Sequence, residues 1–235
     1  MAEKKSEGMS GLLLGIKGYL MQMKEEGAKE VYLSPEGREA LERMIRRVPG
    51  RMTLRELEEM MKKCHKCPIG GDRLNLVFGE GSEKADIVFV GEAPGEDEDE
   101  QGRPFVGRAG QLLTKIVKAM GYEREDVYIA NVLKCRPPGN REPLPEEIQR
   151  CSPYLAMQVE LIKPKAVVAL GKHAAHALLG IETPITKLRG NLKSYRGIPV
   201  MPTFHPSYLL RNPRAKKEVW EDMKRVLEIV KRGRK

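Results

Sequence analysis

Residues 86–107 of the chain read DIVFVGEAPGEDEDEQGRPFVG, and the remaining sequence is best interpreted outward from them. The first part, residues 87–90, is a short apolar run that is typical of a buried strand. A turn rich in glycine and acidic residues follows, and apolar spacing then predicts a helix that begins near Arg108. A strand, a loop and a helix in this order indicate parallel strands joined by crossover helices.

The same alternation repeats towards the C-terminus. The predicted strands are residues 87–90, 127–133, 166–170 and 198–204. Helices with one apolar stripe are expected between and after them, and Ser152 with Pro153 is expected to begin the long helix just after Cys151. The sequence therefore predicts an α/β fold, a three-layer α/β/α arrangement around a four-stranded, mainly parallel sheet.

The N-terminal part of the chain has a different pattern. Apolar residues recur at helical spacing from about residue 10 to residue 25. Thr53 has a glutamate three residues further on, a capping-box pattern that predicts a helix leading to Cys64. We therefore expect residues 1–52 to be an N-terminal helical extension and residues 53–235 to be one α/β domain.

Charge points to a polyanionic partner. The 235 residues contain 42 Lys and Arg against 33 Asp and Glu, a net charge of +9. From His205 to the C-terminus there are ten basic and four acidic side chains, an excess that could follow a phosphate backbone. A solvated final helix is the alternative explanation for this excess.

Composition also bears on the source and the location of the protein. The chain has five Asn and five Gln with 32% charged residues, which favours a heat-loving source. No apolar run approaches about 18 residues, so no membrane span is expected. The N-terminal apolar run is interrupted by Lys17 and no small-residue cleavage site follows, so we expect a cytoplasmic protein.

All four cysteines form one pattern: Cys64, Cys67, Cys135 and Cys151. A close pair with two distant partners predicts one four-thiolate site. Zinc modules usually have two close pairs, whereas an iron–sulfur cluster accepts wider spacing. Spacing alone leaves a cluster, a zinc ion and free or disulfide-bonded thiols as alternatives.

Polar residues follow the predicted strands where loops converge in an open parallel sheet. Glu92 follows the first strand and would face the cleft. Asn131 near the end of the second strand carries an amide that could read a base edge or bond within the sheet. His205 follows the fourth strand and could donate to a developing anion or cap the loop. Lys172, His173 and His176 after the third strand are interpreted as structural or phosphate-contacting.

Two loops extend this set. Phe105 could stack on a base or fill the core beneath its loop. The acidic run near it could bind magnesium, with a solvated turn as the alternative. Beyond His205, bulky apolar side chains and a cation could form a wedge that opens DNA, or could anchor the last helix. This second loop contains Ser207, Tyr208, Leu209, Leu210 and Arg211.

Three long motifs resemble the family 4 uracil-DNA glycosylases, which are iron–sulfur members of the uracil-excision superfamily. The motifs are GEAPGEDEDEQGRPFVG at 91–107, NVLKCRPPGNREPLPEE at 131–147 and TFHPSYLLRNP at 203–213. Together with the cysteine spacing, the resemblance covers about three-quarters of the chain, from roughly Leu57 to the C-terminus. The first fifty residues have no counterpart in the shorter members of that family.

The resemblance implies a 4Fe-4S cluster on the four cysteines and excision of uracil from single- or double-stranded DNA. It assigns the reaction site to Gly91, Glu92 and Ala93 and the stacking ring to Phe105. The base-reading amide would be Asn131, the anion-stabilising group His205, and Glu98 a contact near C5 of the base. We expect a monomer acting on the DNA of a prokaryotic nucleoid. The alternatives are a cluster-bearing DNA-binding module without excision activity and a glycosylase for another deaminated base such as hypoxanthine.

Overall fold

The computed structural model describes residues 52–232. They belong to one compact unit, Met52–Lys235. The helices expected in residues 1–51 lie outside the described residues, so the N-terminal helical extension stays a prediction. No helix among residues 52–232 is both long and apolar enough to cross a bilayer.

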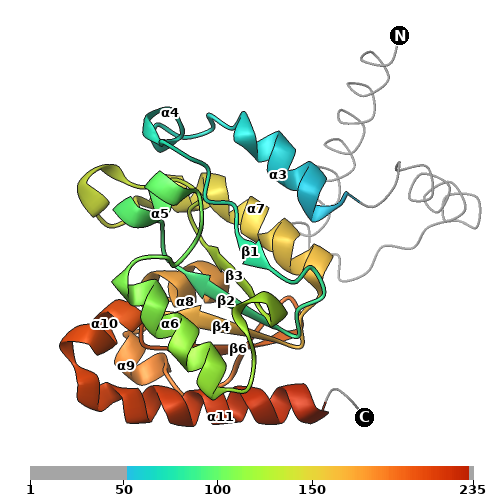
Figure 1. Cartoon of the computed structure of the whole chain (residues 1–235), viewed down its shortest axis with the longest axis vertical. Coiled ribbons are helices and arrows are strands. Elements are labelled where there is room, and N and C mark those ends of the chain that lie inside the picture. The colour runs from blue at the N-terminus through green and yellow to red at the C-terminus, as the bar shows by residue number, and fades with distance from the viewer. Residues whose placement is uncertain (1–51, 233–235) are drawn as a thin grey trace, which may run out of the picture. The chain divides into compact units, whose positions relative to one another are not determined.

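A six-stranded sheet forms the centre of the described unit (Figure 1). The strands are β1 (Glu80–Gly81), β2 (Ile87–Gly91), β3 (Tyr128–Asn131), β4 (Ala166–Leu170), β5 (Lys193–Tyr195) and β6 (Ile198–Thr203). Their order is β1-β3-β2-β4-β6-β5, and the four central strands are parallel. The four predicted strands are confirmed, but the sheet has six strands because β1 and β5 add short antiparallel edges.

Helices cover both faces of the sheet. They are α3 (Leu54–Lys62), α4 (Ile69–Asp72), α5 (Glu96–Gln101), α6 (Arg108–Ala119), α7 (Pro145–Ile162), α8 (Lys172–Leu179), α9 (Ile185–Leu188), α10 (Pro206–Arg211) and α11 (Lys216–Arg232). In Figure 1, α3 and α7 lie on one side of the strands, and α6 and α11 lie on the other. The predicted three-layer arrangement is therefore confirmed.

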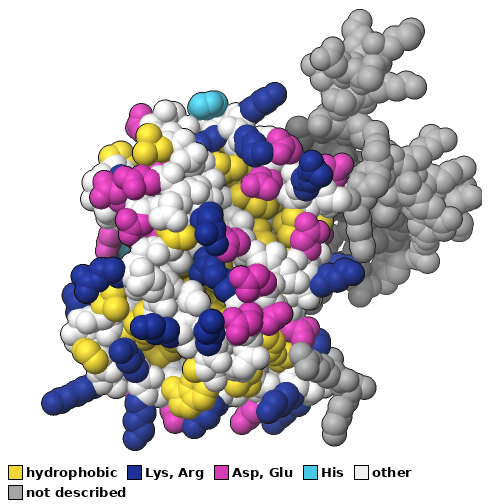
Figure 2. Space-filling model, viewed as in Figure 1, with side chains coloured by type: hydrophobic (Ala, Val, Ile, Leu, Met, Phe, Trp, Pro, Cys, Tyr) yellow, Lys and Arg dark blue, Asp and Glu magenta, His cyan; other side chains and the backbone are white. Residues whose placement is uncertain are grey.

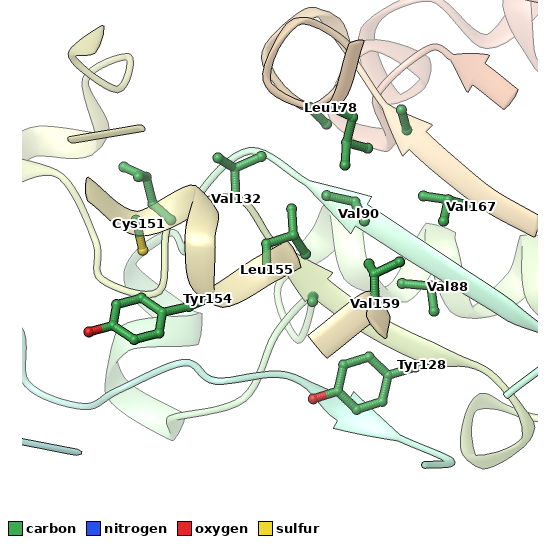
Figure 3. Close-up of a cluster of buried hydrophobic side chains, with 14 of the residues drawn as sticks. Val88, Val90, Tyr128, Val132, Cys151, Tyr154, Leu155, Val159, Val167 and Leu178 are labelled. Carbon is green, nitrogen blue, oxygen red and sulfur yellow. The ribbon is translucent and has the colours of Figure 1, made fainter. Parts of the chain in front are cut away.

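Alternating strand residues divide between two apolar cores, as the period of two in a strand requires. Val88 and Val90 of β2 pack beneath α7, where Figure 3 shows Leu155 and Val159. Phe89 between them faces the opposite core with α6 and α11. Both faces of β2 are buried, which explains why its sequence is a continuous apolar run.

The long helix α7 begins earlier than predicted. It starts at Pro145, where the proline needs no hydrogen-bond acceptor, and the Glu147 carboxylate accepts from Leu144 N at 2.8 Å. Pro153 lies inside the helix, not at its start, and Cys151 is therefore a helical residue. The expected restart at Ser152 and Pro153 was wrong because α7 continues despite the one backbone donor that Pro153 lacks.

Candidate active site

A cavity of about 570 Å³ opens where the carboxyl ends of β2, β3, β4 and β6 meet. Glu92, Asn131 and His205, predicted at three separate strand ends, all line it. Phe105 lines the same cavity. Side chains more than a hundred residues apart in sequence thus share one space of a size suited to a small ligand.

Gly91 allows the amide and the aromatic ring to approach each other. A Cβ at Gly91 would lie 2.3 Å from Asn131 Oδ1 and 2.4 Å from Phe105 Cζ. Both distances are well below van der Waals contact, so a side chain at this position would displace one of the two groups. Gly91 therefore contributes the space that lets both line the cavity.

Asn131 is buried, with 2% of its surface exposed, and its Oδ1 has no hydrogen-bond partner among the described residues. A buried polar atom left in this state costs about 1–3 kcal/mol. The main chain of Asn131 is nevertheless held, since Lys134 Nζ donates to its carbonyl at 2.8 Å. The Asn131 backbone is thus fixed and its side-chain oxygen is free to accept a hydrogen bond from a ligand in the cavity.

Phe105 is held in an uncommon backbone conformation, with φ of 53°. Arg124 donates to the Phe105 carbonyl at 3.2 Å and also to the Pro104 carbonyl. Glu80 of β1 accepts from Arg124 Nε at 3.1 Å. The ring belongs to the α6 and α11 core, which confirms that it fills the core beneath its loop. It also lines the cavity, and stacking on a base stays a prediction.

Glu98 connects the two parts of the acidic loop. Its carboxylate accepts from Val106 N at 2.8 Å, Gly107 N at 2.9 Å and Gly95 N at 3.1 Å. Glu96, Asp97 and Glu100 are exposed, as the solvated-turn interpretation expected. The segment is nevertheless the short helix α5, in which Asp99 is buried and accepts from Leu74 N at 3.1 Å. Glu98 also lines the cavity, and its part in shaping the pocket near C5 stays a prediction.

The protonation of His205 follows from its hydrogen bonds. Ser207 N donates to Nδ1 at 3.1 Å, and because a backbone N–H can only donate, Nδ1 carries no proton. Burial lowers the pKa of His205 to about 4, and the charge of Arg211 adds to that effect. His205 is therefore neutral near pH 7, with its proton on Nε2. His205 caps α10, as the loop-capping interpretation predicted, and its Nε2–H can still donate a hydrogen bond.

Glu92 has His173 as a neighbour, a contact that the sequence analysis did not predict. Burial raises the pKa of Glu92, and His173 opposes this effect. His173 Nε2 lies 3.8 Å from the Glu92 carboxylate, and His173 lines the cavity together with Glu142. The sequence analysis placed His173 after the third strand and interpreted it as structural or phosphate-contacting; the structure places it at the cavity beside Glu92.

The residues that follow His205 differ in how far their side chains are buried. Ser207 bonds to His205 through its hydroxyl at 2.8 Å, whereas Leu209 is 1% exposed and belongs to the core. Leu209 is therefore unavailable to DNA, and its assignment to the DNA-binding segment is corrected: it anchors α10. Tyr208 and Leu210 are 37% and 39% exposed, and Arg211 is exposed beside them.

Basic side chains surround this segment. Figure 2 shows Lys and Arg side chains gathered on the part of the surface formed by α6, α10 and α11. The exposed basic residues on these elements and in the turn between α10 and α11 include Arg108, Lys115, Arg211, Arg214, Lys216 and Lys217.

The four cysteines gather on the α7 side of the sheet. Burial raises the pKa of Cys135, and the thiols of Cys67 and Cys64 raise it further. Burial raises the pKa of Cys151 to about 12, and Cys135 and Cys67 again contribute. Cys135 and Cys151 belong to one buried apolar cluster, and Cys64 and Cys67 pack against it.

Polar groups surround these thiols. Arg73 Nη1 donates to Cys135 Sγ at 3.2 Å and to the Cys64 carbonyl at 3.2 Å, and Tyr154 Oη lies 3.6 Å from Cys64 Sγ. Within residues 52–232, no group of three or more His, Cys, Asp or Glu side chains is arranged to hold a metal ion.

Known proteins match most of the described unit. Residues 78–224 match the sequence model of the Uracil DNA glycosylase superfamily. A type-4 uracil-DNA glycosylase of Thermotoga maritima is 50% identical over 180 residues, which are 75% of this chain and 94% of that protein.

More distant members match as well. A type-4 enzyme of Sulfurisphaera tokodaii is 47% identical over 188 residues, 75% of this chain and 84% of its own length. A type-5 uracil-DNA glycosylase of Pyrobaculum aerophilum is 36% identical over 146 residues, 55% of this chain and 64% of its own. The resemblance seen in the three sequence motifs is confirmed, and the chain belongs to the uracil DNA glycosylase superfamily.

Proposed function

We propose that this chain is a type-4 uracil-DNA glycosylase that flips deoxyuridine out of DNA and hydrolyses its N-glycosidic bond. The products are free uracil and an abasic site. The observation that carries this proposal is the single cavity lined by Glu92, Asn131, Phe105 and His205. The type-4 relatives carry this activity in their names and match the chain over most of their length.

Base recognition rests on Phe105 and Asn131. The flipped base stacks on the Phe105 ring, and the Asn131 amide reads the N3 hydrogen and O4 of uracil. Cytosine presents the opposite donor and acceptor pattern there, so it is rejected if the amide cannot rotate. Lys134 fixes the Asn131 backbone at 2.8 Å, which supports a fixed amide. Thymine requires a separate steric barrier near C5.

Bond cleavage rests on charge stabilisation. As the bond between C1′ and N1 breaks, its electron pair goes to the uracil ring and the sugar becomes a cation. The neutral His205 donates Nε2–H to O2 of the uracil anion. Glu92 stabilises the cation or orients the water that attacks C1′, and both roles need its carboxylate ionised. Excision by these groups does not require a redox step.

We propose that the four cysteines hold a 4Fe-4S cluster. The four cysteines, distant in sequence, lie in or against one apolar cluster, and a cubane cluster accepts thiolates at such irregular sequence spacing. Arg73, which donates to Cys135 Sγ, offers a hydrogen bond and a positive charge to an anionic thiolate. In this proposal the cluster is structural and clamps the segment from Cys135 to Cys151.

The proposed substrate surface lies around α10. Arg211 and neighbouring basic side chains bind the phosphates, and Tyr208 with Leu210 occupies the space that the flipped base leaves. We further propose that the protein acts as a monomer on nucleoid DNA in the cytoplasm of a heat-loving prokaryote.

The test is incubation with a matched set of single- and double-stranded oligonucleotides that contain uracil, hypoxanthine or thymine. Alkali-labile sites at uracil are the expected result. Binding without cleavage would indicate the DNA-binding module, and cleavage at hypoxanthine alone would indicate a glycosylase for another base. Either outcome overturns the proposal.

A further inference from the structure

His173 lies at the cavity on an element that none of the proposed reaction residues occupies. It is the second residue of α8, directly after β4, so it reaches the same edge of the sheet as Glu92 and His205. Its Nε2 lies 3.8 Å from the Glu92 carboxylate and 3.4 Å from the Glu142 carboxylate. The imidazole therefore stands between two acidic groups at the rim of the proposed reaction site.

The ring nitrogen is buried but not satisfied. His173 Nε2 has no hydrogen-bond partner within the described part of the chain, although both carboxylates are within ion-pair distance. A neutral imidazole in this position can leave one buried nitrogen unpaired, which is unfavourable. A protonated imidazole in this position can form ion pairs with two carboxylates within 4 Å.

Most other charged groups around the cavity have partners of their own, although the charge of Lys172 also lowers the pKa of Glu92. Lys172 pairs with Glu142 at 2.9 Å, and Arg141 pairs with Glu147 at 2.6 Å. Glu98 is bonded to backbone donors, His205 is neutral, and Arg211 acts on His205. Glu142 is a like charge for Glu92, so it opposes ionisation of that carboxyl.

We infer that His173 is a positioning residue for the excision reaction: in its protonated form it holds the Glu92 carboxylate ionised and oriented toward the substrate. This inference rests on the proposed function, in which Glu92 acts as a carboxylate. Imidazole side chains change charge between about pH 5 and pH 8. The ion pair is therefore expected to matter most at acidic pH, where a buried carboxyl such as Glu92 would otherwise take up a proton.

The test compares pH profiles of single-turnover uracil excision for the wild type and His173→Gln. Loss of a cation within 4 Å raises the pKa of a partly buried carboxyl such as Glu92 by about one unit. His173→Gln should therefore move the acid midpoint of the profile upward by about one pH unit. Below that midpoint, excision should fall by up to about tenfold. At alkaline pH, where imidazole side chains in general lose their charge, the rates of the two proteins should converge.

Two further variants separate positioning from structure. His173→Lys keeps a cation and should restore the acid midpoint to the wild-type value or below it. His176→Gln is the matched control on the same helix, since His176 Nε2 bonds to the Thr183 carbonyl at 2.9 Å and does not line the cavity. His176→Gln should leave the midpoint unchanged.

The outcomes are distinct. An unchanged midpoint in His173→Gln, or an equal loss of rate at every pH, overturns the inference while leaving wild-type uracil excision intact. If His173→Gln does not fold, a raised midpoint in His173→Lys overturns it instead. A wild-type protein that does not excise uracil at any pH would contradict the proposed function itself.

Discussion

Replacing Glu98 with alanine tests whether one carboxylate holds the loop that carries Phe105. The carboxylate accepts three backbone hydrogen bonds, from Val106, Gly107 and Gly95, at 2.8, 2.9 and 3.1 Å. A hydrogen bond to a charged group contributes about 1.5–3 kcal/mol, and partial exposure here reduces this to about 1 kcal/mol each. We therefore expect Glu98→Ala to lower the free energy of unfolding by about 3 kcal/mol.

Thermal unfolding and excision measure the two consequences. In a domain of this size, about 3 kcal/mol corresponds to a decrease in Tm of about 6–12 °C. Uracil excision should fall by at least about tenfold, because a loosened loop no longer fixes the Phe105 ring against the base. Glu98→Gln should have a smaller effect, since its carbonyl can still accept from Val106 and Gly107.

Glu100→Ala is the matched control. Glu100 lies on the same short helix, loses the same charge and has an exposed side chain. If Glu98→Ala and Glu100→Ala have the same Tm and the same rate of excision, the proposed role of the three hydrogen bonds is refuted.

Three further predictions concern the amide, the ring and the cysteines. Asn131→Ala should keep its fold and lose at least about 100-fold in excision, and a normal rate would reject the base-reading role. Arg124→Met should slow excision, but not when Phe105 is already alanine; independent losses in the double mutant would show that Arg124 does not act through the ring. The purified protein should be yellow-brown with about four irons per chain, and a colourless protein holding one zinc would reject the cluster.

The central sheet was predictable because its strands are buried on both faces. Strands such as β2 and β4 are entirely buried, and their sequences are continuous apolar runs. The edge strands β1 and β5 have two and three residues, partly exposed, and carry no such pattern. The start of α7 was missed because Pro153 resembles a helix start, whereas a proline can also be accommodated within a long packed helix.

The candidate site was predictable where polar residues follow strands. Glu92, Asn131 and His205 were found from the rule that parallel strands end at the same edge of a sheet. The sequence did not predict the contacts of Arg124 and His173, because each contacts a residue from a distant segment of the chain. Arg124 reaches back to the Phe105 carbonyl, and only the folded chain places His173 beside Glu92.

The short segment from Asn131 to Cys135 explains how a structural cluster could affect catalysis without electron transfer. Between these residues, the buried Lys134 donates to the Asn131 carbonyl at 2.8 Å and to Gln158 of α7 at 2.6 Å. A cluster on Cys135 would therefore fix one end of the segment whose other end presents the Asn131 amide to the cavity. Loss of iron should then lower both the Tm and the rate of excision, whereas a change in oxidation state that leaves the cluster intact should change neither.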